Sequence, residues 1–208
     1  MRRWQPLGSC RLGNQENLQF LMNRRKLQLT LRFPPLFFQD GVERPIQRPK
    51  DAEAQKAYYS GKKKHHSIKN NILINAESKV VFLTPSCEGR IHDERIADIA
   101  GYSPPPGSVL YQDTGFQGFK CPGLKIIQPK KKPKGQDLTS EEKAKNREIP
   151  SIRIRVEHAI AGIKRFRIVK DKLRNFKKGF ADCVMETCCG LHNFRLNFRP
   201  WVYPIPQD

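Results

Sequence analysis

The stretch HSIKNNILINAESKVVFLTP, residues 66–85, decides the fold that this sequence predicts. In its first part Ile68, Ile72 and Ile74 lie two or four residues apart, which is the period of a β-strand with one buried face. Residues 79–85 form a second apolar run, and only Ala76-Glu77-Ser78 separates the two. Strands joined by so short a turn pair in antiparallel fashion.

Apolar runs on both sides of this hairpin extend the predicted sheet. LFFQD, residues 36–40, lies between Pro34-Pro35 and Gly41, and these breakers bound a short buried strand. SVLYQD, residues 108–113, and LKIIQP, residues 124–129, are two further runs of the same kind. The sequence therefore predicts five strands.

Helical patterns separate and follow the strands. HDERIADIAGY, residues 92–102, predicts a short helix with a glycine near its end. The charged connection 129–150 contains TSEE at 139–142, which is typical of a helix start, and Pro150 either ends that helix or opens the next. Helices are also expected over 151–167 and 176–196. The order predicts an α/β fold whose mixed sheet has three antiparallel strands, a helix and two further strands, with C-terminal helices.

The chain divides into three predicted parts. Residues 1–34 form a short, poorly patterned segment with one possible helix near 16–26. Residues 35–198 hold every strand signal and are expected to form one domain. Residues 199–208, RPWVYPIPQD, form an extended, proline-rich tail.

The composition indicates a polyanionic partner. Lysine and arginine number 39 against 20 acidic residues, giving a net charge of +19. Such an excess favours nucleic acid, with an acidic membrane surface as the alternative. No apolar run reaches about 18 residues and no signal peptide is evident, so we expect a cytoplasmic protein associated with the nucleoid. The six cysteines lack a CxxC pair, which favours free thiols over a zinc site.

Three acidic residues are candidates for chemistry. Asp40 and Asp113 each end a predicted strand, and strand ends are where α/β sheets gather ligand-binding groups. For either residue alone the commoner role is to begin a turn, as Asp-Gly does at 40–41. Glu157 is the lone acid of RIRVEHAIAGIKRF, residues 153–166. A helical wheel places Glu157 beside the apolar stripe that must face the sheet, where it could meet both aspartates. The stripe consists of Ile152, Val156, Ala159, Ile160, Ile163 and Phe166.

Three converging carboxylates repel one another unless a cation lies between them. Mg²⁺ or Mn²⁺ suits such an oxygen-rich site, and two ions about 3.5–4 Å apart can serve phosphoryl transfer. Arg153 and Lys164 lie on the same side of the predicted helix as Glu157, well placed for the phosphates of a polyanion. The alternative for these two residues is a solvated basic face.

Four blocks of this sequence resemble DDE transposases of bacterial insertion sequences, with a Harbinger-like DDE superfamily endonuclease domain. The resemblance spans about residues 36–200 and rests on QDGVERPIQRPKD, YYSGKKKHHSIKN, DTGFQG and RIRVEHAIAGIKRF, in the family's order. It implies an RNase H-like fold and a metal-binding catalytic triad of Asp40, Asp113 and Glu157. It also implies that Arg153 and Lys164 are the family's basic residues around the glutamate.

Two departures from the family accompany this resemblance. Pro150 occupies a position that is often tyrosine. Relatives also carry an N-terminal helical DNA-binding region, whereas residues 1–34 look unlike it, and we expect a truncated N-terminus whose remnant or replacement is this segment.

The resemblance implies a transposase that cleaves and joins DNA, as a homo-oligomer on the element ends and target DNA. Two alternatives remain open: an inactive derivative that only binds DNA, and an RNase H-like nuclease without strand transfer. Two lysine blocks are further DNA-contact candidates, although each could equally be a solvated charge run. They consist of Lys62, Lys63 and Lys64, and of Lys130, Lys131 and Lys132.

Overall fold

The computed structural model describes residues 35–203 apart from 103, 134 and 136. Its centre is a sheet with the strand order β2-β3-β1-β6-β7, in which β4 and β5 also pair with β3. β1 and β4 run antiparallel to β3, whereas β6 runs parallel to β1 and β7 parallel to β6. The strands are β1 (Leu36–Pro45), β2 (Tyr59–Ser60), β3 (His65–Asn75), β4 (Val80–Leu83), β5 (Cys87–Glu88), β6 (Val109–Tyr111) and β7 (Lys125–Ile127).

This arrangement confirms the predicted α/β class with a mixed sheet and C-terminal helices, and it is compatible with an RNase H-like fold. The hairpin that began the sequence argument is β3 and β4. Its turn is held by the Asn75 side chain, whose Oδ1 accepts hydrogen bonds from the backbone N–H groups of Glu77 and Lys79. The possible helix near 16–26 lies outside the described residues.

Strand β1 is twice as long as the sequence predicted. It continues through Asp40 and Gly41 to Pro45, with residues 41–45 paired to residues 71–67 of β3. The interpretation of Asp40-Gly41 as a turn is therefore wrong. Asp40 nevertheless lies at an edge, because the parallel neighbour β6 pairs with β1 only as far as Phe38 and Tyr111.

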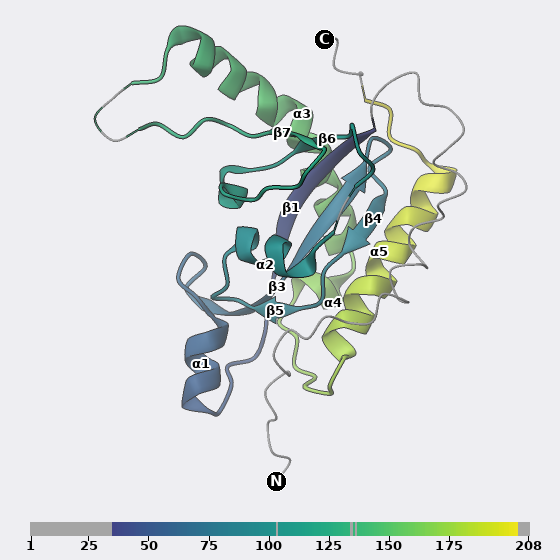
Figure 1. Cartoon of the computed structure of the whole chain (residues 1–208). Coiled ribbons are helices and arrows are strands. Elements are labelled where there is room, and N and C mark those ends of the chain that lie inside the picture. The colour runs from purple at the N-terminus through teal and green to yellow at the C-terminus, as the bar shows by residue number, and fades with distance from the viewer. Residues whose placement is uncertain (1–34, 103, 134, 136, 204–208) are drawn as a thin grey trace.

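The helices lie on both faces of the sheet (Figure 1). Two further helical pieces, α1 and α4, have no counterpart in the predicted set. The elements are α1 (Ala52–Tyr58), α2 (Asp93–Ala100), the 3₁₀ turn η2 (Thr114–Phe116), α3 (Ser140–Lys164), α4 (Arg167–Lys170) and α5 (Phe180–Phe198).

Helix α3 begins where the sequence predicted and then passes through its proline. The Thr139 hydroxyl accepts from the Glu142 backbone N–H at 3.2 Å, and Glu142 Oε2 accepts from the Thr139 N–H at 2.9 Å, which makes a complete capping box. Pro150 neither ends this helix nor opens another, because it lies inside a continuous 25-residue helix. A proline removes only one backbone donor here, and the buried Ile149 beside it anchors the chain in the core.

Side chains of β1 alternate between two cores. Phe38 and Val42 face a core shared with α3 and α5, which contains Val156, Ala159 and Ile163 of the predicted stripe. Phe37 faces a second core formed with α2 and the segment after β6. We call these two sides of the sheet the α3 face and the α2 face. By the period of a strand, Asp40 projects on the α3 face and Gln39 on the α2 face.

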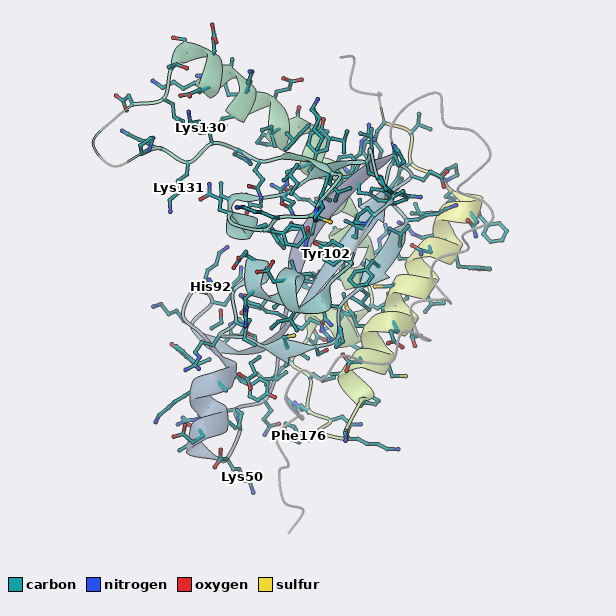
Figure 2. The ribbon with its side chains drawn as sticks, viewed as in Figure 1. Lys50, His92, Tyr102, Lys130, Lys131 and Phe176 are labelled. Atoms are coloured by element: carbon teal, nitrogen blue, oxygen red, sulfur yellow. The ribbon has the colours of Figure 1, made fainter. Side chains whose placement is uncertain are left out.

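The first half of α3 and the connection from β7 extend away from the sheet as an arm (Figure 1). Asn146 joins the two limbs of this arm, since its Oδ1 accepts from the Lys130 backbone N–H and its Nδ2 donates to the Lys130 carbonyl, both at 2.8 Å. Figure 2 shows Lys130 and Lys131 on the limb that leads out of β7.

The start of the predicted tail packs against α3 and α5. The Tyr203 hydroxyl lies 2.7 Å from His158 Nδ1, and the Arg195 guanidinium lies over the Trp201 ring. Within the described part of the chain, no helix is both long and apolar enough to cross a membrane.

Candidate active site

Asp40 and Asp113 lie side by side on the α3 face. Asp40 and Asp113 each come two residues after Phe38 and Tyr111, the last pair between β1 and β6. Strands in parallel register place such residues on the same face of the sheet. Two carboxylates that are far apart in the sequence thus meet at the place where β1 and β6 separate.

Arg153 of α3 lies between the two aspartates. Its Nη2 is 3.5 Å from Asp40 Oδ2 and its Nη1 is 3.6 Å from Asp113 Oδ1. The arginine is only 7% exposed, so both ion pairs form in a poorly solvated place where a charge needs a partner. Sequence reasoning placed Arg153 near the site as a phosphate contact, and it did not foresee this bridge.

The surroundings of Asp40 oppose its negative charge. Burial raises the pKa of this carboxyl to about 6, and the nearby charges of Asp113 and Asp93 act in the same direction. Arg153 and a hydrogen bond from the Gly41 backbone N–H lower the pKa but do not cancel the effect of burial. A carboxylate in this state gains from a cation placed beside it.

Asp93, at the start of α2, lies against the opposite face of β1. A Cβ atom at Gly41 would come within 2.9 Å of the Asp93 carboxyl carbon, so the residue after Asp40 must be small. Lys69 of β3 pairs with Asp93 at 3.3 Å. The charge of Asp93 therefore reaches Asp40 from behind the strand.

Glu157 lies one helical turn beyond Arg153 and is exposed. Across the described residues, no three His, Cys, Asp or Glu side chains are close enough to hold a metal ion together. The structure therefore brings together Asp40, Asp113 and Arg153, and it does not bring Glu157 into the same cluster.

A basic depression of about 230 Å³ is lined in part by Lys164, whose charge interacts with that of Asp40. Lys63, Lys164 and Lys170 contribute ammonium groups to it, together with His65 and one acid, Glu43. Burial lowers the pKa of Lys164, and so does the neighbouring charge of Lys63, while Asp40 and Glu43 act in the opposite direction. Like charges gathered around a half-buried lysine favour an anion in this depression.

The two predicted lysine blocks have different surroundings. Lys62, Lys63 and Lys64 form an exposed turn just before β3, and Lys63 reaches the basic depression. In the arm, Lys130 forms an ion pair with Glu142 and Lys132 with Asp137. Both blocks are exposed, so both could contact the phosphates of a polyanion. Lys130 and Lys132 of the arm, however, already have acidic neighbours.

Three hydrogen-bonded glutamines near the aspartates were missed, of which two are buried and the third is partly buried. Gln39 and Gln112 immediately precede Asp40 and Asp113, and a third glutamine, Gln128, follows β7. Gln112 Nε2 donates to Gln39 Oε1 at 2.5 Å, and Gln128 Nε2 donates to Gln112 Oε1 at 2.6 Å. The repeated Gln-Asp pair at two strand ends was the available signal.

The donor set fits a divalent cation. Asp40 and Asp113 offer hard oxygen ligands of the kind that Mg²⁺ and Mn²⁺ prefer, and they already hold a positive group between them. The raised pKa of Asp40 reflects a negative charge that its surroundings leave undercompensated.

Comparison with known proteins identifies the family. Residues 39–193 match the family described as DDE superfamily endonuclease. The chain is 33% identical over 164 residues to the probable transposase for insertion sequence element IS702 from Microchaete diplosiphon, an alignment that covers 79% of this chain and 58% of that protein. No solved structure matches the chain significantly. The matched span contains Asp40, Asp113 and Glu157, and the chain belongs to the family of DDE superfamily endonucleases.

Proposed function

We propose that this chain cleaves the phosphodiester bonds of DNA at the ends of an insertion sequence and joins the freed 3′-hydroxyl to target DNA. The observation that carries the proposal is the bridge that Arg153 makes between Asp40 and Asp113, within the span matched by the endonuclease family. We place this activity in residues 35–198, with DNA as the partner and a homo-oligomer as the form that acts on it.

Asp40, Asp113 and Glu157 are the proposed ligands of two Mg²⁺ or Mn²⁺ ions. Bound there, these ions activate a hydroxyl nucleophile and stabilise the leaving oxygen on phosphorus. The exposed Glu157 side chain has to turn toward the aspartates to join them. It lies one helical turn from Arg153 on α3. Arg153 would then exchange its contacts with the aspartates for contacts with phosphate oxygens.

Lys164 and Lys63 are the proposed phosphate contacts beside the aspartates. Their ammonium groups line the same depression, and the charge of Lys164 interacts with that of Asp40. A DNA backbone that lies in it would present phosphates to the lysines and a neighbouring phosphodiester bond to Asp40 and Asp113. Such positioning supplies a large part of the catalysis of phosphoryl transfer.

The separation of Glu157 from the aspartates favours one alternative, a chain that binds DNA without cutting it. The two functions differ in their dependence on the acids. Cleavage requires the acids and a divalent metal, whereas binding by lysines requires neither. A nuclease without strand transfer would yield nicked DNA and no joined product.

The test is a plasmid nicking and joining assay in Mg²⁺ or Mn²⁺, using Asp40→Asn, Asp113→Asn and Glu157→Gln variants. Each variant should lose at least about 100-fold in cleavage rate while its DNA affinity stays near that of the wild type. Asp98→Asn, an exposed acid of α2 away from the site, is the matched control and should cut normally. Undiminished cleavage by the Glu157→Gln variant would remove Glu157 from the site.

A further inference from the structure

Three glutamines form a continuous ladder across three parallel strands, with Gln39 and Gln112 buried and Gln128 partly buried. Gln39 and Gln112 follow Phe38 and Tyr111, the last residues paired between β1 and β6. Gln128 follows Ile127, the last residue of β7 paired with β6. Their side-chain amides are joined in sequence by hydrogen bonds of 2.5 and 2.6 Å. We call these three residues the amide ladder.

The ladder is placed where the sheet loses its backbone pairing. β6 pairs with β1 no further than Tyr111 and Phe38. Between segments 39–41 and 112–114, both fully described, the direct hydrogen bond is the one from Gln112 to Gln39. The aspartates next to these glutamines carry like charges that repel one another wherever Arg153 does not bridge them. The hydrogen bond between the Gln112 and Gln39 side chains, on the α2 face, opposes a separation of the two strand ends.

The third rung extends this constraint to the chain after Asp113. Gln128 Nε2 also donates to the carbonyl oxygen of Phe116 at 3.0 Å. Phe116 ends the 3₁₀ turn η2, for which Asp113 is the residue before the first. The ladder therefore holds Asp113 from both sides, through the neighbouring Gln112 and through the turn that follows.

Stability alone does not explain polar residues at these positions. Gln39 is 1% exposed and Gln112 is not exposed at all, and the Tyr102 hydroxyl lies within interaction range of both side chains. Replacing both members of a buried hydrogen-bonded pair with apolar side chains of the same shape is nearly neutral for stability. An apolar pair would fill this space equally well, but it would not fix a distance between the strands.

We propose that the amide ladder is a positioning device, which sets the spacing of Asp40 and Asp113 and thereby the affinity of this pair for a divalent cation. The inference rests on the proposed function in one respect, namely that the two aspartates bind metal. The glutamines contact neither the cation nor DNA in this role. They act through the backbone of the residues that follow them, as supporting groups do around other metal sites.

The test is the double variant Gln39→Met/Gln112→Met, which removes both partners of the central bond and keeps side chains of similar length. Gln47→Met is the matched control, because Gln47 is an exposed glutamine outside the amide ladder. Mn²⁺ affinity is measured by calorimetry without DNA, below the melting temperature of every variant. Hydrogen exchange of segments 36–45 and 108–116 is measured in a chelator, so that this readout does not depend on metal.

We expect the double variant to bind Mn²⁺ about 10-fold or more weakly, with faster exchange in both segments and nearly unchanged unfolding free energy. Gln47→Met should leave Mn²⁺ affinity unchanged. Equal Mn²⁺ affinity in the wild type and the double variant would overturn the positioning role, provided that Asp40→Asn weakens binding. If Asp40→Asn leaves Mn²⁺ binding unchanged, the proposed metal site itself fails. Faster exchange in the double variant would then show only that the ladder holds the two strand ends together.

Discussion

The burial of the Asp40 carboxylate carries a cost to stability. The pKa of this carboxyl is raised to about 6 by burial, above its ordinary value of 3.8. The folded state therefore binds the proton more tightly than the unfolded state does. The cost of the negative charge is fully present above pH 6 and disappears as the pH falls toward 4.

Asp40→Asn should therefore stabilise the fold at neutral pH. The neutral amide avoids the burial of a charge, and a pKa shift from 3.8 to about 6 corresponds to about 3 kcal/mol at pH 7. The gain should shrink through pH 6 and vanish near pH 4. Urea unfolding of the wild type and the variant at a series of pH values measures it. Asp98→Asn should show no such trend, and a destabilised Asp40→Asn variant at pH 7 would mean that the Arg153 ion pair outweighs burial.

The sequence could predict which acids meet on the sheet but not what lies between them. Asp40 and Asp113 follow similar apolar runs, and parallel register then makes them neighbours. The helical wheel placed Arg153 and Glu157 on one side of α3, yet the arginine is buried and the glutamate exposed. A wheel gives angles around the helix axis, whereas the height and tilt of α3 over the strand ends decide which side chain reaches the aspartates.

At the scale of elements, the extension of β1 depends on contacts remote in sequence. Gly41, Glu43 and Pro45 are poor strand residues, so no local pattern predicted the second half of this strand. Arg44 is nearly fully buried there. Its guanidinium donates to Asn70 Oδ1 and Ser86 Oγ at 2.8 and 2.7 Å and to the Ala181 carbonyl at 2.9 Å. This network joins β1 to β3 and α5. No pattern within one segment of the sequence predicts contacts between residues so far apart in the chain.

The packing of α3 on α5 rests on a close approach at Gly162. A Cβ atom there would lie 2.6 Å from His192 Nδ1. The His192 ring has little freedom to withdraw, because it is buried and its Nε2 lies 3.1 Å from the Ser78 carbonyl oxygen. The absence of a side chain at 162 thus fixes the spacing of the two helices that cover the α3 face.

Gly162→Ala should destabilise the protein although alanine is the better helix former. Overpacking costs about 1–3 kcal/mol and exceeds the gain in helix propensity of about 1 kcal/mol. Gly190→Ala, in α5, is the matched control, because a Cβ atom there meets nothing within 4 Å. That variant should gain about 0.5–1 kcal/mol. Chemical denaturation compares the two, and equal stabilisation by both substitutions would refute the close contact.

For the whole molecule, the net charge of +19 predicted a polyanionic partner without telling which lysines serve it. Ion pairs decide this, and they form only in the folded chain. Lys130 and Lys132 of the arm lie beside Glu142 and Asp137. Lys63 instead shares the basic depression with Lys164, close to Asp40. A lysine with an acidic partner has less charge to offer to a phosphate.

The two lysine blocks should therefore contribute unequally to DNA binding. Each phosphate contact lowers the slope of log K against log salt by about 0.9. Replacing Lys62, Lys63 and Lys64 with glutamine should reduce this slope by about 2 to 3. The same change at Lys130, Lys131 and Lys132 should reduce it by about 1. Two of these lysines, Lys130 and Lys132, already have acidic partners and contribute little to phosphate binding. Fluorescence anisotropy of a labelled duplex across a potassium chloride series gives both slopes. A larger loss from the arm block would show that DNA lies along the arm, with its phosphates displacing Glu142 and Asp137, and would move the binding face away from the depression beside Asp40.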